Sequence, residues 1–133
     1  DLHGKAKQLV ALELERAGYR VKDLGESVPP EEFRRAARQS RPVAVAVSCM
    51  LASALDKAQQ TVRGLLDLPA DRAPLVVMGG AAVKEGFALE DCGAQAWAAD
   101  AAGAAEALMR LQSQERTQSN TAVSKSKKST KKR

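Results

Sequence analysis

The sequence predicts an α/β fold in which helices cover both faces of a parallel β-sheet. Two continuous apolar runs, residues 43–47 and 75–78, have the composition of strands that are covered on both faces. Stripes of apolar residues at helical spacing lie between and around these runs. Together the expected elements alternate as α-β-α-β-α-β-α-β-α, an order that is typical of a parallel sheet wound with helices.

Local signals set the expected ends of these elements. The first helix stops at Gly18, and the second begins at Pro29-Pro30 with two acidic residues in its first turn. A capping arrangement at residues 53–56 starts the third helix. We therefore expect helices over residues 6–17, from 30 to before Pro42, from about 53 to 66, 83–91 and 101–111, and strands over residues 19–24, 43–47, 75–78 and 96–98.

The charge of the chain divides it into two parts. The formal net charge is +5, but residues 113–133 carry seven Lys or Arg and one acid, while residues 1–112 carry fourteen basic and fifteen acidic residues. The polar tail lacks the apolar residues that would offset the entropy of ordering. We expect a folded domain over 1–112 and a disordered basic tail over 113–133, which we interpret as a solubilising extension rather than a nucleic-acid contact.

Composition also limits the location and chemistry of the protein. No apolar run approaches the 18 residues of a membrane span, and Cys49 and Cys92 show no metal-ligand spacing. We expect a cytoplasmic protein with two buried thiols. Because His3 is the only histidine, no Ser-His or Cys-His catalytic pair is expected if His3 binds a metal. No catalytic residue is predicted, which leaves open whether the chain is part of an enzyme.

The expected site lies where the strands end. In such a sheet, ligands bind beyond the carboxyl ends of the strands. Ser48 follows one buried strand and Gly79-Gly80 follows the next, so these residues should meet at one edge. Glycine there would allow close approach of backbone to ligand.

At this point the chain resembles the cobalamin-binding domain family of methionine synthase, corrinoid methyl carriers, mutases and sensory regulators. The matching motifs are Asp1-Leu2-His3-Gly4, Ser48-Cys49-Met50 and Gly79-Gly80. Residues 17–33 also look like the methyltransferase branch of that family. The resemblance covers residues 1–110 and implies a Rossmann-like, flavodoxin-type sheet that holds a corrinoid.

The resemblance also implies a role for each motif residue. His3 would be the lower axial ligand of cobalt, and Asp1 would orient its imidazole and raise its basicity. The other expected contacts to cobalamin come from the first motif, the strand ends and the start of the last helix, namely Leu2, Gly4, Ser48, Met50, Gly79, Gly80 and Ala101.

The chain departs from the family pattern at three positions. Ala6 stands in place of a glycine after His3, and Met50 replaces a leucine of similar volume. Ala54 stands where the methionine synthase branch has a serine that extends the Asp-His pair. The family sheet has strand order 2-1-3-4-5, and its first strand ends before the Asp-x-His motif. We therefore expect that the central strand is missing from this fragment, that the protein continues upstream, and that these residues alone bind weakly or fold poorly.

Two functions fit this resemblance. The first is a corrinoid carrier that passes methyl groups between cobalt and methyltransferase domains or subunits, next to a helical cap region upstream. The alternative is a cobalamin- or light-sensing domain of a transcriptional regulator. A third interpretation is a Rossmann-like domain that binds nothing. The residues 23–33 favour the carrier, whereas Ala6, Ala54 and the basic tail favour the sensor.

Overall fold

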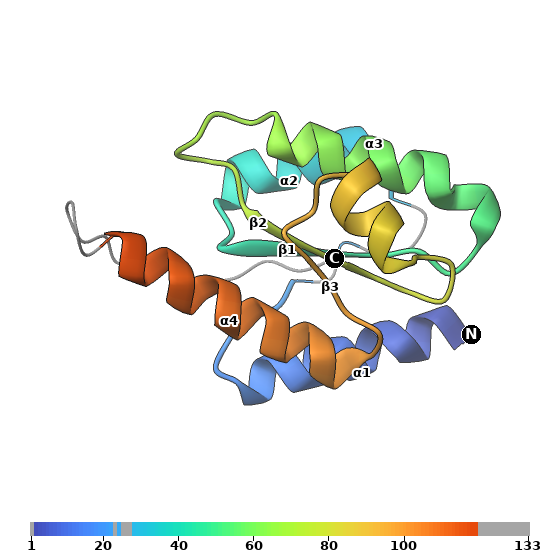
Figure 1. The fold of residues 1–133 in the computed structure, drawn as a ribbon, viewed down its shortest axis with the longest axis horizontal. Coiled ribbons are helices and arrows are strands. Elements are labelled where there is room, and N and C mark those ends of the chain that lie inside the picture. The colour runs from blue at the N-terminus through green and yellow to red at the C-terminus, as the bar shows by residue number, and fades with distance from the viewer. Residues whose placement is uncertain (1, 23, 25–27, 120–133) are drawn as a thin grey trace.

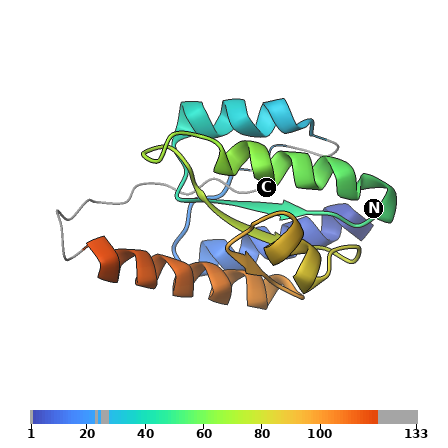
Figure 2. The same cartoon turned by 45° about the horizontal axis from the view of Figure 1, so that its top comes forward.

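The protein forms three layers, with a parallel sheet between two pairs of helices (Figures 1 and 2). This arrangement is seen in a computed structural model that describes residues 2–22, 24 and 28–119, and the side chains of residues 9–115 within those ranges. Helices α2 and α3 pack together on one face, and α1 and α4 pack together on the other. The predicted fold class is confirmed for this part of the chain.

The sheet contains three strands in the order β1-β2-β3, all parallel. Strand β1 spans Ala44–Ser48, β2 spans Leu75–Gly79, and β3 is the short pair Ala96–Trp97. The register places Ala44 opposite Leu75 and Ser48 opposite Gly79, so β1 and β2 end at the same edge. The carboxyl ends of the strands therefore meet where the sequence places its polar and glycine residues.

The helices lie close to their predicted positions. They are α1 (Leu2–Arg16), α2 (Pro30–Ser40), α3 (Leu55–Leu66), which follows the 3₁₀ turn η1 (Ala52–Ala54), the π-helical turn η2 (Phe87–Asp91), and α4 (Ala101–Ser119). Helix α2 starts at proline with Glu31 and Glu32 in its first turn, as expected at the positive end of a helix dipole. It ends at Arg41, whose φ of +48° lies in the left-handed region.

Side chains of the strands alternate between the two faces of the sheet. Val45 and Val47 face α2 and α3, where they join a cluster that includes Val62 and Leu65 of α3. Ala44 faces the other side and packs with α1 and α4. Because both faces are covered, the continuous apolar runs in the sequence are explained by burial on two sides rather than one.

The predicted strand over residues 19–24 is wrong: the described residues 19–22 and 24 are not in a strand. Instead, the Tyr19 N–H donates to the Leu14 carbonyl at 3.0 Å, and the Tyr19 hydroxyl donates to the Gln112 side chain. Tyr19 and Val21 pack against the Leu14–Ala44 cluster. A strand needs a neighbour for its backbone groups, and in the described ranges β1 and β2 pair with no strand other than each other and β3.

Two other segments differ from their predicted limits. Helix α4 continues past Gln112, where the sequence predicted the folded domain to end, so residues 113–119 are helical. No glycine or proline stops it there, and Gln112 is itself buried against Tyr19. The predicted helix over 83–91 is shorter and partly π-helical, because Gly80 and the following turn occupy its start. The rest of the predicted tail, 120–133, lies outside the described residues.

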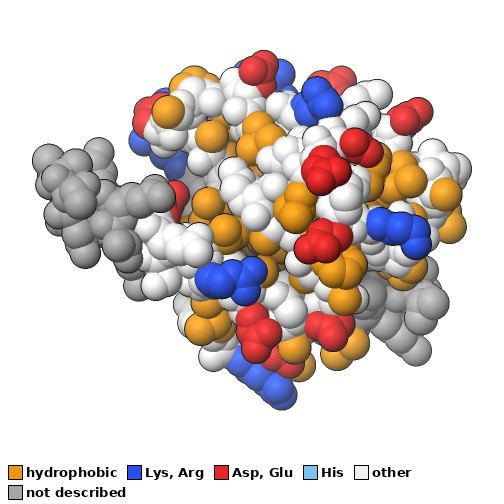
Figure 3. Space-filling view, in the orientation of Figure 1, with side chains coloured by type: hydrophobic (Ala, Val, Ile, Leu, Met, Phe, Trp, Pro, Cys, Tyr) orange, Lys and Arg blue, Asp and Glu red, His pale blue; other side chains and the backbone are white. Residues whose placement is uncertain are grey.

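The surface of the folded part carries mixed charge. On the face shown in Figure 3, acidic side chains gather over η2, where Glu85, Glu90 and Asp91 are exposed. Because these residues are acidic, the positive net charge of the whole chain does not mark this face as a surface for a polyanion.

None of the helices in the described ranges combines the length and apolar character that crossing a bilayer requires.

The core under α3 provides a test of the packing. Leu65 is completely buried there, so Leu65→Ala should leave a cavity and lower the free energy of unfolding by about 2–5 kcal/mol. Leu51 is 66% exposed, and Leu51→Ala should change the free energy of unfolding by less than about 0.5 kcal/mol. Urea denaturation followed by circular dichroism measures both. Equal effects of the two substitutions would contradict this packing.

Candidate functional site

A cavity of about 770 Å³ opens at the carboxyl edge of the sheet. Its wall is mostly apolar and comes from α1, from the ends of β1, β2 and β3, and from the start of α4. Five of the predicted contact residues line it, namely Ser48, Met50, Gly79, Gly80 and Ala101. Residues that lie up to 53 positions apart in the sequence thus meet at one place, as the strand-end argument predicted.

The loops after β1 and β2 are joined by backbone hydrogen bonds. The Cys49 N–H donates to the Gly79 carbonyl at 3.0 Å, and the Cys49 carbonyl accepts the Ala82 N–H at 3.1 Å. The Val83 N–H donates to the Gly80 carbonyl at 3.0 Å and closes the turn that follows β2. Cys49 is therefore held through both of its backbone groups, and this fixes Ser48 and Met50 on either side of it.

The two glycines are required by close backbone contacts. A Cβ on Gly80 would lie 2.3 Å from the Cys49 carbonyl oxygen, and the Gly80 φ of +106° is strained for other residues. A Cβ on Gly79 would lie 2.9 Å from the Ala98 carbonyl oxygen. The sequence argument assigned both glycines to contact with a ligand. In the structure their visible task is to let three strand ends pack closely around the cavity.

Met50 makes a contact that the leucine of the family pattern could not make. Its sulfur accepts the Ala81 N–H at 3.5 Å, a weak hydrogen bond across the two loops. The substitution therefore preserves the apolar volume at the cavity wall and adds a tie between loop 49–51 and loop 80–82.

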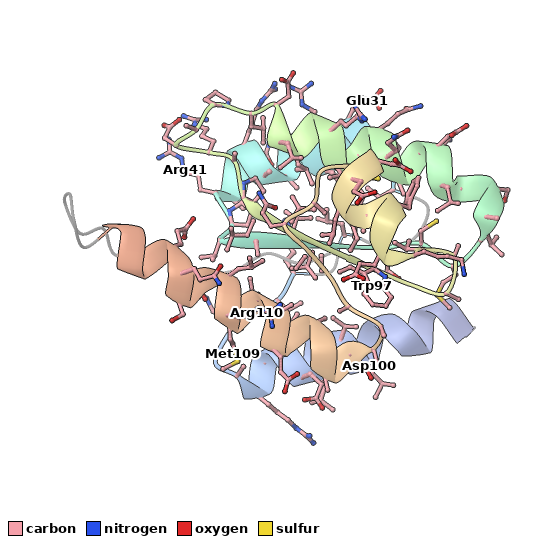
Figure 4. The ribbon with its side chains drawn as sticks, viewed as in Figure 1. Glu31, Arg41, Trp97, Asp100, Met109 and Arg110 are labelled. Atoms are coloured by element: carbon pink, nitrogen blue, oxygen red, sulfur yellow. The ribbon has the colours of Figure 1, made fainter. Side chains whose placement is uncertain are left out.

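The start of α4 forms the opposite side of the cavity. The Asp100 carboxylate caps this helix by accepting the Gly103 N–H at 2.8 Å. The Trp97 indole N–H donates to the Val83 carbonyl at 3.0 Å, which leaves the ring against the cavity. Figure 4 shows Trp97 between η2 and the start of α4, with Asp100 at the same end of the molecule.

Sequence reasoning did not assign Trp97 or Asp100 to the site. It interpreted Trp97 as packing, and the structure shows that this residue both packs and lines the cavity. An acid directly before an alanine-rich helix is a typical N-cap, so the capping role of Asp100 could have been predicted from the sequence. Lys84 and Glu85 also line the cavity, and no pattern in the sequence marked them.

The remaining predicted residues belong to the beginning of the chain. Leu2, His3 and Gly4 lie in the first turn of α1, but their side chains are outside the described set. Asp1 lies outside the described residues altogether. Further along α1, Leu9 and Val10 reach the cavity wall. Across the described residues, no group of three or more His, Cys, Asp or Glu side chains is placed to hold a metal.

The thiols of Cys49 and Cys92 are both buried. Burial raises the pKa of the Cys49 thiol, and a smaller effect of the Leu51 backbone acts in the opposite direction. The S–H donates to the Leu51 carbonyl at 3.3 Å. Burial also raises the pKa of the Cys92 thiol, against a smaller effect of Arg63. Both thiols therefore stay protonated at neutral pH and behave as small apolar side chains, as predicted.

A parallel sheet with an apolar cavity at its carboxyl edge defines an α/β ligand-binding domain. Residues 1–109 match the sequence profile of the B12 binding domain, and the chain belongs to that family. Membership of this family implies a cobalamin cofactor, which is the class that the sequence motifs suggested.

Similar proteins support the assignment. Dimethylamine corrinoid protein 1 of Methanosarcina mazei is 26% identical over 104 residues, which are 78% of this chain and 48% of that protein. Trimethylamine corrinoid protein 1 of the same organism is 30% identical over 88 residues, or 66% and 41% of the two chains. A solved structure of a novel cobalamin-binding protein from Desulfitobacterium hafniense DCB-2 has a TM-score of 0.74 at 29% identity, and the match covers 83% of this chain and 53% of that one. This chain thus spans about half the length of these relatives.

The cavity suits part of a cobalamin. Its volume lies within the range of about 300–1,000 Å³ that is usual for cofactor and ligand pockets. The apolar wall and the close-packed glycine backbone would accept a flat heteroaromatic group such as the cofactor's nucleotide base. The residues present therefore fit the cofactor that the family implies.

The Gly80 contact predicts a selective loss of stability. Gly80→Ala should lower the free energy of unfolding by at least about 2 kcal/mol, because a Cβ meets the Cys49 backbone and the residue adopts positive φ. Gly86 is the matched control, since it has helical φ and ψ of −61° and −40° and its nearest atom lies 3.9 Å from the added Cβ. Gly86→Ala should be neutral or stabilise by up to about 1 kcal/mol. Thermal denaturation of both variants measures the two effects. A larger loss of stability in Gly86→Ala than in Gly80→Ala would contradict the close contact at Gly80.

The raised thiol pKa values predict slow alkylation. At pH 8 the folded chain should react with iodoacetamide at least about tenfold more slowly than a free cysteine, because less thiolate is present and both sulfurs are buried. The rate should rise as pH rises, and urea should remove the protection. Mass spectrometry of the alkylated chain measures each site. Equal rates for the folded and unfolded chains would contradict the burial of the thiols.

Proposed function

We propose that this domain is a corrinoid carrier that binds cobalamin with the nucleotide tail in the cavity and His3 as the lower axial ligand of cobalt. The observation that supports it most is the meeting of Ser48, Met50, Gly79, Gly80 and Ala101 around one apolar cavity at the strand ends. When bound, the cofactor would supply a cobalt centre that accepts and gives up a methyl group.

The residues of the chain have separate tasks in this proposal. The loop after β1, held by the backbone of Cys49, presents Ser48 and Met50 to the tail. The glycine pair keeps the opposite wall free of side chains. The imidazole of His3 would bind cobalt, and the Asp1 carboxylate would accept a hydrogen bond from the N–H of its second ring nitrogen and so hold the correct tautomer.

The partners in this proposal are methyltransferase domains or subunits, which would supply the methyl donor and acceptor. Its support is the similarity to the dimethylamine and trimethylamine corrinoid proteins of Methanosarcina mazei. Within the described part of the domain, the two thiols are buried, and no group of three or more His, Cys, Asp or Glu side chains is placed to hold a metal. A carrier needs to hold and present the corrinoid, and the reaction partners complete the chemistry.

A titration with cobalamin tests the proposal with two signals. Trp97 is the only tryptophan and lines the cavity, so binding of the tail should quench its fluorescence. Visible absorption should at the same time report replacement of the cofactor's own base by an imidazole. Because His3 is the only histidine, His3→Ala should abolish the imidazole signal while the quenching remains.

Gln8→Ala on the same helix is the control and should keep both signals. An imidazole spectrum that persists in His3→Ala would overturn the assignment of the cobalt ligand. Absence of quenching and of any absorption change in the unsubstituted chain would overturn the placement of the tail in this cavity.

A further inference from the structure

Met50 places a thioether in the wall of the cavity. Its sulfur accepts the Ala81 N–H at 3.5 Å and so joins the loop after β1 to the loop after β2. A thioether packs as an apolar group, but unlike a hydrocarbon side chain it is readily oxidised to a sulfoxide, which is polar. Met50 therefore brings an oxidisable group to the surface that encloses the cavity.

The three methionines of the chain differ in exposure and in place. Met78 also lines the cavity, but it is completely buried in the core. Met109 is 50% exposed on α4 and is not part of the cavity wall (Figure 4). Met50 is half-buried and lines the open cavity. An oxidant in solution can thus reach Met50 and Met109, and of these two Met50 is the one that borders the space proposed for the cofactor.

The two cysteines are poor competitors for the same oxidant. Peroxide oxidises a cysteine through its thiolate. Cys49 and Cys92 are both buried, and burial raises the pKa of each thiol. In the folded chain, a two-electron oxidant should therefore react with exposed methionine before it reacts with cysteine.

A sulfoxide at Met50 changes the cavity wall. The sulfur and the Ala81 nitrogen lie 3.5 Å apart, which leaves no room for an oxygen atom between them at hydrogen-bonding distance from the nitrogen. The loop has little freedom to retreat, because both backbone groups of Cys49 are bonded to the end of β2 and the turn after it, and Gly80 packs against them. An oxygen on the bonded lone pair must therefore push the loops apart, and an oxygen on the second lone pair makes this part of the wall polar.

Either change opposes the binding of an apolar group. The wall is mostly apolar, and in the proposed function the flat base of the cofactor tail packs against it. A sulfoxide oxygen that is covered by such a group loses its hydrogen bonds to water and gains none in return. Oxidation of Met50 should therefore weaken the binding of the tail.

We propose that Met50 is a site of reversible oxidation by hydrogen peroxide that controls binding of the cofactor tail, an inference that rests on the proposed function. The sulfur lone pair attacks one peroxide oxygen, and the S–O bond forms as the O–O bond breaks. The leaving hydroxide takes the proton of the transferred hydroxyl and becomes water, so the sulfur is oxidised by two electrons and the peroxide is reduced. Methionine sulfoxide reductases reverse the step, releasing the oxygen as water while a dithiol is oxidised to a disulfide.

The experiment compares cobalamin binding before and after peroxide treatment of the full chain. The peroxide is removed, mass spectrometry measures oxidation at each methionine, and cobalamin is titrated while Trp97 fluorescence is followed. Sulfoxide at Met50 should raise the dissociation constant at least about tenfold, and treatment with the reductases should restore it. Met78 should stay unoxidised, because it is completely buried.

Two variants identify the residue responsible, each compared with its own untreated sample. Met50→Leu removes the thioether and keeps an apolar side chain of similar volume, so peroxide should leave its dissociation constant unchanged. Met109→Leu is the matched control, because it removes the exposed thioether outside the cavity and leaves Met50 in place. Peroxide should weaken its binding as much as in the unsubstituted chain.

Three results would overturn the proposal alone. They are unchanged binding by a chain with sulfoxide at Met50, complete oxidation of Met109 while Met50 stays a thioether, and equal losses of binding in Met50→Leu and the unsubstituted chain. A lack of cobalamin binding before peroxide is added would overturn the proposed function and this inference with it. The untreated sample therefore distinguishes the two failures.

Discussion

The structure depends on the backbone contact between the ends of β1 and β2. Cys49 donates to Gly79 and accepts from Ala82, and this exchange leaves no room for a side chain at Gly80. The cavity wall, the direction of Ser48 and the sulfur contact of Met50 all follow from it. The cavity is thus formed by bringing two loops of the protein together, and the glycine pair is required by the packing of the protein itself.

The second constraint is that parallel strands need neighbours on both sides. Strand β2 has them, and its residues from Val76 to Met78 are almost fully buried. Among the described residues, strand β1 has one neighbour, yet its composition is as apolar as that of β2. Residues 19–22 do not pair with the sheet, and they are held by side-chain packing and by the bonds of Tyr19 to Leu14 and Gln112. Val21 lines the same cavity as Ala46 and Ser48 of β1.

The sequence was sufficient where an element depends on its own residues. Continuous apolar runs located β1 and β2, and capping and proline signals located α2. It failed where an element depends on a neighbour: residues 19–24 have strand propensity, but the described residues 19–22 and 24 do not pair with the sheet. It also ended α4 too early, because the burial of Gln112 against Tyr19 is a tertiary contact. Trp97 was missed as a site residue because one side chain both packs in the domain and lines the cavity, and the sequence alone does not distinguish these two roles.

Helix α1 connects the cavity with the proposed cobalt ligand. The same helix contributes Leu9 and Val10 to the cavity wall and carries His3 in its first turn. Its position is set by packing on α4 through Leu14 and Leu108 near its carboxyl end. Leu9, Val10 and Ala11 in its middle line the cavity together with Ala46 and Ser48 of β1. If His3 is the cobalt ligand, the packing of α1 on α4 sets the position of the helix turn that carries it relative to the cavity.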